Sequence, residues 1–220
     1  FGVKTYFIVY DLLPIFYDEY FPKEWLLKET HTNWLKVIKE SNGAICISKA
    51  IENELKQWLQ TNPSNNKRFF TNSFHLGANL ENSKPTKGLL SNSNKILNFL
   101  SQRTSFLMVG TIEPRKSYNQ TLEAFEELWR ESIEVNLIIV GKKGWLVDDL
   151  IIKLQNHPEL NKKLFWLEGI SDEYLEKVYK NSHCLISASK AEGFGLPLIE
   201  AARYEIPIIA RDIPVFKEVA

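Results

Sequence analysis

The segment Phe106-Leu-Met-Val-Gly-Thr-Ile-Glu-Pro-Arg-Lys116 is a short apolar run that ends in a loop. Its first four residues are all apolar, which is typical of a strand buried on both faces of a parallel sheet. Gly110 permits a tight turn after the strand, and Arg115 and Lys116 place two cations before a helix, whose N-terminus also favours an anion. The loop is a candidate phosphate site, although it lacks the glycine spacing of a Walker loop. A solvated pair of basic residues is the alternative interpretation.

The second half of the chain repeats this alternation of strand and helix. Further short apolar runs predict strands at Val135–Val140, Leu164–Leu167, Cys184–Ser187 and Ile206–Ala210. Amphipathic stretches lie between them, and their apolar positions keep helical spacing at Leu122, Phe125, Leu128 and Trp129, and at Leu175, Val178 and Tyr179. This order predicts βαβ units and an α/β, Rossmann-like, doubly wound domain. Ligands of such domains bind at the carboxyl ends of the strands.

A second candidate loop is Ser187-Ala-Ser-Lys-Ala-Glu-Gly-Phe-Gly-Leu-Pro-Leu-Ile-Glu200. Gly193 and Gly195 permit close approach of the backbone to a ligand. Glu192 falls in the loop and Glu200 about one turn into the helix that follows, so both can face one crevice. A carboxylate there can accept hydrogen bonds from neighbouring hydroxyls of a sugar. The alternative for Glu200 is a helix residue favoured only by the dipole.

A third loop, Gly141-Lys-Lys-Gly-Trp145, follows the second of these strands. Lys142 can add positive charge near a diphosphate, but exposed lysines are also common in turns. The histidines lack the spacing of a metal site, and His183, which opens a predicted strand, is expected in the core.

The first half of the chain contains fewer elements. We expect a strand at Thr5–Tyr10, a helix near Lys23–Lys39, a strand at Ala44–Ile47 and a helix capped by Ser48. Two strands and two helices do not make a stable open sheet, so this half is interpreted as part of a domain. The Asn/Ser-rich residues 81–96 are predicted to be a linker or surface insertion. The predicted division is residues 1–90 for this partial domain with the linker, and 91–220 for the second domain.

Composition narrows the choice of partners. The 220 residues contain 27 Lys plus Arg and 27 Asp plus Glu, and this neutral balance argues against a nucleic-acid partner. Residues 1–104 carry a net charge of +4 and residues 105–220 one of −4. Cys46 and Cys184 lie in apolar runs typical of buried thiols, which favours a cytoplasmic setting. No run approaches the length of a membrane span.

Four segments together resemble the retaining glycosyltransferases of family four, which have the GT-B fold of two Rossmann-like domains. They are Val109-Gly-Thr-Ile-Glu-Pro-Arg-Lys116, Asn136-Leu-Ile-Ile-Val-Gly-Lys-Lys-Gly-Trp145, Glu168-Gly-Ile-Ser-Asp-Glu-Tyr-Leu175 and Glu192-Gly-Phe-Gly-Leu-Pro-Leu-Ile-Glu200. Residues 5–80 resemble the second half of the family's N-terminal domain, which makes that domain only partly present. Within the family, the chain resembles bacterial mannosyltransferases of lipopolysaccharide or capsular polysaccharide synthesis.

The resemblance implies roles for the candidate residues. Glu200 binds the ribose of a nucleotide-sugar donor, and catalytic Glu192 holds the donor sugar and phosphates together with the backbone of Gly193, Phe194, Gly195 and Leu196. Arg115 and Lys116 neutralise the departing diphosphate, while Gly110, Thr111 and Lys142 complete the donor site. The family needs no metal and no cofactor, because fixed cations and backbone amides supply the charge stabilisation. Many relatives have Arg where this chain has Thr111 and His where it has Tyr10.

The expected function is transfer of a sugar, with mannose from GDP-mannose as the leading choice, to a glycan or lipid-linked glycan acceptor at the inner membrane surface. Two alternatives stay open. The first is a non-catalytic nucleotide-sugar-binding module. The second is another GT-B enzyme such as a phosphorylase.

Overall fold

The computed structural model describes residues 2–77 and 84–220. The described chain divides into two compact units. The first unit takes in the residues up to Gly77 together with Ala191–Gly195 and Asp212–Ala220, and the second takes in the remaining residues up to Lys190 together with Leu196–Arg211. The predicted domain boundary at residue 90 stays a prediction. That prediction assumed two continuous segments, whereas each compact unit is built from segments that alternate along the chain.

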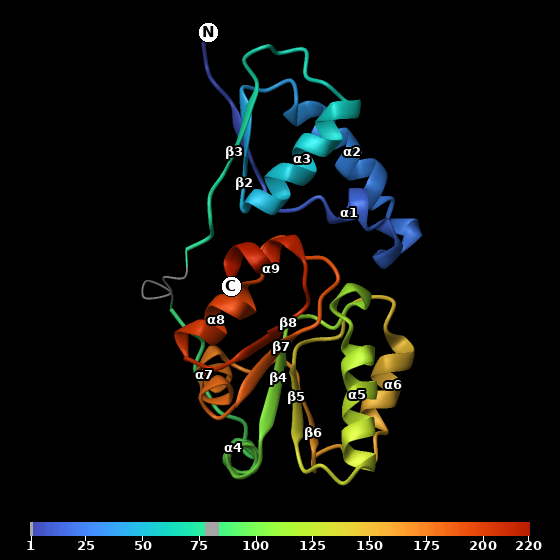
Figure 1. Ribbon diagram of the computed structural model, residues 1–220, viewed down its shortest axis with the longest axis vertical. Helices are drawn as coiled ribbons and strands as arrows, with labels where there is room; N and C mark the ends of the chain where they lie inside the picture. Colours follow the sequence, from blue (N-terminus) through green and yellow to red (C-terminus); the bar gives the residue numbers. More distant parts are fainter. Residues whose placement is uncertain (1, 78–83) are drawn as a thin grey trace. The chain divides into compact units, whose positions relative to one another are not determined.

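The second unit is built on a parallel five-stranded sheet in the order β6-β5-β4-β7-β8 (Figure 1). Its strands are β4 (Ser105–Val109), β5 (Asn136–Val140), β6 (Leu164–Leu167), β7 (Cys184–Ser187) and β8 (Ile208–Ala210). All residues of β5 are buried, as expected for a strand covered on both faces. The sheet confirms the predicted α/β class and every strand that the apolar runs indicated in this half.

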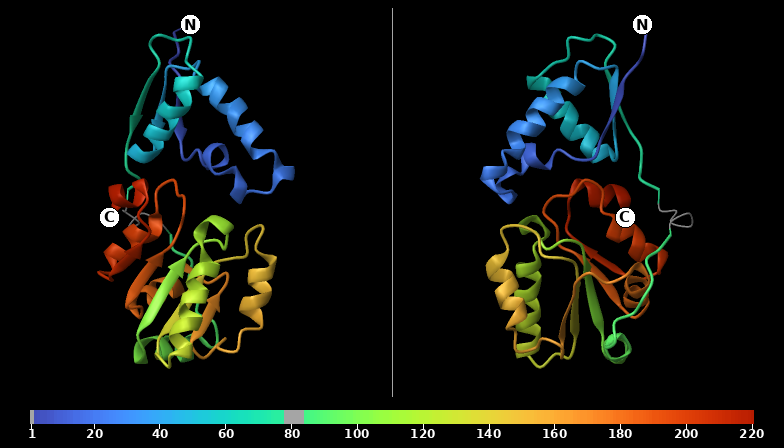
Figure 2. Two further views of the ribbon diagram at one scale, coloured as in Figure 1. Left: turned by 45° about the vertical axis from the view of Figure 1, so that its right-hand side comes forward. Right: turned by 180° about the vertical axis from the view of Figure 1, so that it is seen from behind.

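Helices cover both faces of this sheet, as Figures 1 and 2 show. One face carries α5 (Tyr118–Arg130) and α6 (Asp148–Gln155). The other carries α4 (Ser93–Gln102), α7 (Asp172–Lys180) and α8 (Leu196–Arg203). This is the doubly wound arrangement, in which loops at the carboxyl ends of the strands form the ligand-binding edge.

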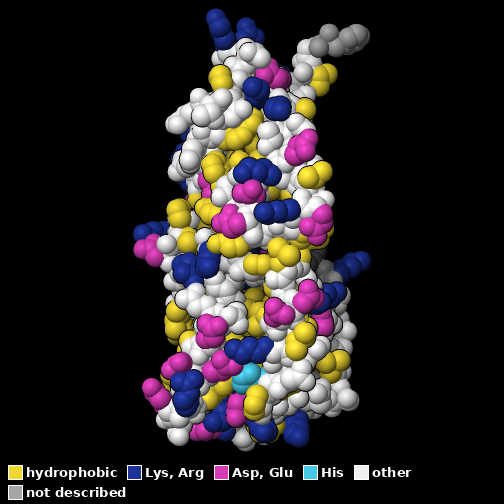
Figure 3. All heavy atoms as spheres, turned by 90° about the vertical axis from the view of Figure 1, so that its right-hand side faces the viewer, with side chains coloured by type: hydrophobic (Ala, Val, Ile, Leu, Met, Phe, Trp, Pro, Cys, Tyr) yellow, Lys and Arg dark blue, Asp and Glu magenta, His cyan; other side chains and the backbone are white. Residues whose placement is uncertain are grey.

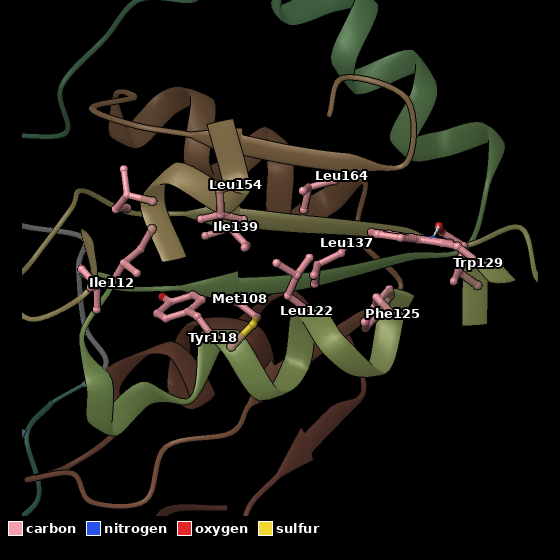
Figure 4. Packing of buried hydrophobic residues seen from close by; sticks show 13 residues of the cluster. Met108, Ile112, Tyr118, Leu122, Phe125, Trp129, Leu137, Ile139, Leu154 and Leu164 are labelled. Atoms are coloured by element: carbon pink, nitrogen blue, oxygen red, sulfur yellow. Dashed lines mark hydrogen bonds between the residues drawn. The ribbon is translucent and has the colours of Figure 1, made fainter. Parts of the chain in front are cut away.

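The core between α5 and the sheet explains why these residues fold as they do. Leu122, Phe125 and Trp129, spaced three or four residues apart, point from α5 toward Leu137 and Ile139 of β5 (Figure 4). Burial of side chains of this size contributes about 1.5–3 kcal/mol each. The packing fixes α5 and, with it, the loop that connects β4 to α5.

The first unit has a three-stranded parallel sheet in the order β1-β2-β3. Its elements are β1 (Tyr6–Val9), α1 (Leu13–Phe16), α2 (Leu27–Ile38), β2 (Gly43–Cys46), α3 (Lys49–Thr61), β3 (Phe70–Ser73) and α9 (Pro214–Val219). Val9, Ala44 and Cys46 face a core that Leu35 of α2 and Leu55 of α3 complete. The other face of this sheet carries the exposed aromatic side chains of Tyr6 and Phe70, which pair with Gly43 from either side. Their ring centroids lie 5.6 Å apart across this glycine.

The N-terminus of α3 is saturated by protein groups. Ser48 Oγ accepts a hydrogen bond from the Ile51 N–H at 3.2 Å, which confirms the predicted cap. The Glu218 carboxylate of α9 accepts from the N–H groups of Lys49 at 2.6 Å and Ala50 at 2.8 Å. These contacts fill the donor positions that a helix N-terminus leaves open.

Several sequence-based expectations were wrong in detail. The helix expected at Lys23–Lys39 begins only at Leu27, because Leu26 adopts a left-handed conformation (φ 49°) after a 3₁₀ turn at Lys23–Trp25. Within the predicted linker 81–96, residues 81–83 lie outside the described residues, and α4 begins at Ser93. His183, expected in the core, is exposed, and its Nδ1 accepts the Ser105 N–H at 3.2 Å.

Both cysteines are buried free thiols, as expected. Across the described residues, no helix combines the length and apolar character that crossing a membrane requires.

Candidate functional site

The loop after β4 holds a lysine directly over a glycine. Gly110 has a φ of 134°, which favours glycine, and its N–H donates to the Val140 carbonyl at 2.9 Å. A Cβ placed on Gly110 would lie 3.1 Å from Lys116 Nζ, so the lysine side chain folds back over the glycine backbone. The loop thereby places a positive charge at the carboxyl end of β4, where a doubly wound sheet binds its ligands.

Arg115 is held inside the same loop. Its Nε lies 2.8 Å from Glu113 Oε2, and the two side chains are only 12% and 7% exposed. The Arg115 carbonyl also accepts the Lys190 N–H at 2.8 Å, which ties this loop to the one that follows β7. Arg115 thus stabilises the loop and has a local counter-charge, while its predicted contact with a diphosphate stays a prediction.

The loop after β5 runs against the loop after β4. The Ile112 N–H donates to the Lys142 carbonyl at 2.9 Å, and the Gly144 N–H returns a bond to the Ile112 carbonyl at 3.0 Å. Gly141 permits this approach, because a Cβ at that position would lie 1.9 Å from the Gly110 carbonyl oxygen. The pairing brings Lys142 next to the segment that contains Gly110 and Thr111. Both Lys142 and Thr111 are exposed.

The helix α5, which follows the β4 loop, begins without a side-chain N-cap. Pro114–Lys116 form a 3₁₀ turn, and Ser117 adopts a left-handed φ of 56° without capping α5 through its side chain. Tyr118, the first residue of α5, is buried and donates from its hydroxyl to the Gly110 carbonyl at 2.6 Å. This bond fixes the glycine turn beneath Lys116.

Glu200 lies on α8 and is half-buried. Its Oε2 accepts a hydrogen bond from the Tyr179 hydroxyl of α7 at 2.6 Å. Both residues line a cavity of about 340 Å³ between α7 and α8, together with Arg203 and Tyr204. Burial and the Glu200 carboxylate raise the pKa of Tyr179 well above its ordinary value. The phenol therefore stays a hydrogen-bond donor through the neutral pH range.

Residues Ala191–Gly195, which include Glu192 and the Gly-Phe-Gly sequence, belong to the first compact unit. The Gly193 carbonyl accepts from Ser48 Oγ at 3.0 Å, and a Cβ on Gly193 would lie 2.5 Å from the Tyr10 carbonyl oxygen. Phe194 is buried, and its ring meets that of His75 at 5.8 Å. Packing within the unit thus explains Gly193 and Phe194, which the sequence reasoning assigned to donor binding alone.

The structure gathers one group of the predicted residues within the second unit. The loops after β4 and β5 bring together Gly110, Thr111, Arg115, Lys116 and Lys142. Glu200 and Leu196 belong to the same unit on α8, whereas Glu192, Gly193, Phe194 and Gly195 belong to the other unit.

Sequence reasoning missed two tyrosines that hold the site. Tyr179 was placed on the apolar face of its helix, and Tyr118 was not considered. A buried tyrosine usually finds a partner for its hydroxyl, so each such residue next to a candidate loop is itself a signal.

A larger cavity of about 620 Å³ lies beside the start of α5 and α6. Asp148 and Asp149 line it, and Lys143 pairs with Asp148. With Glu113, which also lines it, three carboxylates make this cavity unfavourable for a phosphate. On the face over α5 and α6, seen in the lower part of Figure 3, acidic and basic side chains are interspersed, and Lys153 pairs with Glu126 at 2.9 Å.

Comparisons with known proteins agree on one family. Residues 91–220 match the family model described as glycosyl transferases group 1. Over 226 aligned residues the chain is 47% identical to the serotype-specific mannosyltransferase WbdA of Escherichia coli, with all of this chain and 27% of WbdA covered. It is also 35% identical over 117 residues to the O-antigen chain mannosyltransferase RfbU of Salmonella typhimurium, which covers 52% of this chain and 31% of RfbU. The chain thus spans about a quarter of the length of WbdA.

Solved structures show the same fold. HepE of Anabaena in complex with UDP-glucose aligns with a TM-score of 0.68 at 16% identity, covering 99% of this chain and 56% of HepE. An Escherichia coli trehalose-6-phosphate protein bound with UDP-2-fluoro glucose also gives a TM-score of 0.68, at 13% identity, covering 90% of this chain and 50% of that protein.

Proposed function

This chain belongs to the glycosyl transferases group 1 family, and from that premise we propose that it takes part in transferring mannose from a nucleotide-sugar donor to a growing glycan. The observation that carries the proposal is the Lys116 ammonium folded over Gly110 at the carboxyl end of β4. A diphosphate develops negative charge when it leaves, and a fixed cation at that point lowers the barrier. The choice of mannose rests on the 47% identity to WbdA, which is described as a mannosyltransferase.

The reaction breaks the bond between the anomeric carbon of the sugar and the diphosphate oxygen. The acceptor oxygen bonds to the same carbon from the same face, and its proton passes to the departing diphosphate. Lys116, assisted by Arg115 and Lys142, balances the charge on that diphosphate. The configuration at the anomeric carbon is retained.

The remaining predicted residues hold the donor. Glu200 accepts hydrogen bonds from the ribose hydroxyls, and Glu192 with the backbone from Gly193 to Leu196 holds the donor sugar and its phosphates. Thr111 stands where the resemblance places an arginine in many members of the family, so the proposed charge stabilisation depends more heavily on Lys116. GDP-mannose is the proposed donor, a lipid-linked glycan at a membrane surface is the proposed acceptor, and no metal or cofactor is required.

Lys116→Met in the complete protein tests this proposal. We expect kcat for sugar transfer to fall by about 100-fold or more, because a cation that acts on the departing charge is removed. Lys162→Met is the matched control, since the Lys162 Nζ donates to the Pro158 carbonyl just before β6, at the opposite edge of the sheet. Transfer should continue unchanged in the control.

Titration calorimetry with GDP-, UDP- and ADP-mannose identifies the donor. Unchanged turnover in Lys116→Met contradicts the proposal. Saturable donor binding without turnover in the unaltered protein favours the non-catalytic binding module instead.

A further inference from the structure

An almost fully buried tyrosine holds one oxygen of Glu200. Tyr179 is 1% exposed, and its hydroxyl donates to Glu200 Oε2 at 2.6 Å, the short distance of a hydrogen bond to a charged acceptor. The two residues come from neighbouring helices, α7 and α8. The bond therefore fixes the Glu200 side chain relative to a second element, beyond what α8 alone provides.

The phenol has little freedom to turn away. Its ring stacks on Tyr204 with the centroids 5.2 Å apart and the planes 22° from parallel. Lys180 Nζ lies 6.0 Å above the Tyr204 ring. A buried hydroxyl that lost Glu200 would also lose hydrogen bonding altogether, which costs about 1–3 kcal/mol. The pair consequently behaves as one rigid unit.

The second oxygen of Glu200 is left for a ligand. Within the described residues, Oε1 of Glu200 accepts no hydrogen bond and forms no ion pair. An ionised carboxylate offers about four lone-pair positions on its two oxygens, and Tyr179 occupies one of those on Oε2. With Oε2 held, Oε1 and the second lone pair of Oε2 have fixed directions that suit the two hydroxyls of a vicinal diol.

We propose that Tyr179 is a positioning residue that aims the Glu200 carboxylate at the 2′ and 3′ hydroxyls of the donor ribose. The proposal rests on the proposed function, in which Glu200 binds that ribose. Tyr179 touches no substrate and acts through Glu200. It makes the site select a ribonucleotide over a 2′-deoxyribonucleotide, because the aimed carboxylate loses one hydrogen bond with the deoxy ligand.

Tyr179→Phe in the complete protein tests this role, with GDP and 2′-deoxy-GDP as calorimetric probes. The unaltered protein is expected to bind GDP about tenfold more tightly than 2′-deoxy-GDP, the value of one hydrogen bond to a charged group. In Tyr179→Phe this ratio should fall to about two. Replacing Tyr179 with 4-aminophenylalanine, which restores an N–H donor, should recover the ratio.

Tyr174→Phe is the matched control on the same helix. The Tyr174 hydroxyl is buried and has no hydrogen-bond partner among the described residues, so its removal deletes the same atom without touching Glu200. The ratio of its affinities for GDP and 2′-deoxy-GDP should equal that of the unaltered protein. An equal loss in Tyr174→Phe would show a general effect on α7 and overturn the proposal.

A double variant separates the positioning role of Tyr179 from the ribose contact of Glu200. If Tyr179 acts through Glu200, Tyr179→Phe combined with Glu200→Gln should lose no more discrimination than Glu200→Gln alone. If Glu200→Gln loses the preference for GDP over 2′-deoxy-GDP while Tyr179→Phe keeps it in full, the positioning role of Tyr179 is overturned and the proposed function stands. Full retention in Glu200→Gln contradicts the ribose contact itself, and with it both proposals.

Discussion

Glu54 on α3 is a half-buried carboxyl in an unfavourable electrostatic setting. Its Oε2 is buried and accepts no hydrogen bond within the described residues. Burial and the negative charge of Asp11 raise the pKa of Glu54 to about 7, although a hydrogen bond with Tyr17 acts in the opposite direction. Between about pH 4.5 and pH 7, Glu54 is therefore protonated in the folded protein but ionised in the unfolded chain.

This difference predicts a loss of stability as the pH rises. Because the pKa of Glu54 is raised by folding, its contribution is complete below about pH 4.5 and disappears as the pH rises through about 7. The free energy of unfolding should fall by about 1–2 kcal/mol over that range. This value is smaller than the one that the full pKa shift would give, because the half-buried side chain is partly screened by solvent. Urea unfolding at a series of pH values measures it.

Glu54→Gln should remove this slope, since the amide does not titrate. Glu29→Gln on α2 is the control, because Glu29 is exposed and should leave the slope as it is. A slope in Glu54→Gln equal to that of the unaltered protein would show that another group is responsible.

Single residues were predictable where their role is local. Gly110 directly follows β4 and adopts the expected turn, and Lys116 ends the same loop, so the sequence indicates the turn and a cation near it, while the role of that cation stays a prediction. The Gly193 and Phe194 packing could not be predicted, because it depends on Tyr10, Ser48 and His75, which are remote in sequence. The Tyr179 contact with Glu200 was missed for the same reason.

At the scale of elements, the loops after β4 and β5 behave as one structure. They exchange two backbone hydrogen bonds through Ile112, and they meet where Gly141 has no side chain. Trp166 Nε1 also donates to the Gly141 carbonyl at 2.9 Å, which fixes the turn from the neighbouring strand β6. A single methyl group at Gly141 would separate the two loops.

Gly141→Ala should destabilise the protein by about 1–3 kcal/mol, the usual cost of overpacking. It should also weaken binding of GDP, because Lys142 and the Gly110 turn are displaced together. Denaturant unfolding and calorimetry measure the two effects. Gly77→Ala is the matched control, since a Cβ there meets nothing within 4 Å. Equal stability of the two variants would contradict this account of the paired loops.

The strands of the second unit were predictable because strands buried on both faces are continuously apolar. β3 was missed because its sequence, Phe-Thr-Asn-Ser, is mostly polar and only half-buried. α4 was partly hidden in an Asn/Ser-rich stretch, although Ile96 and Leu100 carry its buried face. Patterns in short, half-exposed elements are weak because few of their side chains reach a core.

At the scale of the whole molecule, the first unit depends on a segment that is distant in sequence. Glu218 of α9 binds the N-terminus of α3, and its Oε1 also lies 2.7 Å from His75 Nε2. Val215 and Phe216 of the same helix are buried. Burial alone raises the pKa of Glu218, but the bonds from Lys49, Ala50 and His75 lower it overall.

Glu218→Ala should lower the free energy of unfolding by about 1–2 kcal/mol, because two helix N–H groups lose their acceptor. Hydrogen exchange should accelerate at Lys49 and Ala50 while β5 stays protected. Asp212→Ala is the control, since among the described residues the Asp212 carboxylate forms an exposed ion pair with Lys217, and its loss should change stability little. Unchanged exchange at the start of α3 in Glu218→Ala would contradict the role of this carboxylate.

The interleaving of the two units affects the order in which the protein can fold during synthesis. Val9, Leu35 and Leu55 are translated before the second unit, but α9 and the Ala191–Gly195 segment follow only after most of the second unit has been translated. Until then the α3 N-terminus lacks the Glu218 carboxylate that saturates it, and the Gly193 carbonyl is not there to accept from Ser48. The first unit is completed only after the second has been translated through Arg211, so premature termination before residue 212 leaves an unfinished first unit exposed to proteases and chaperones.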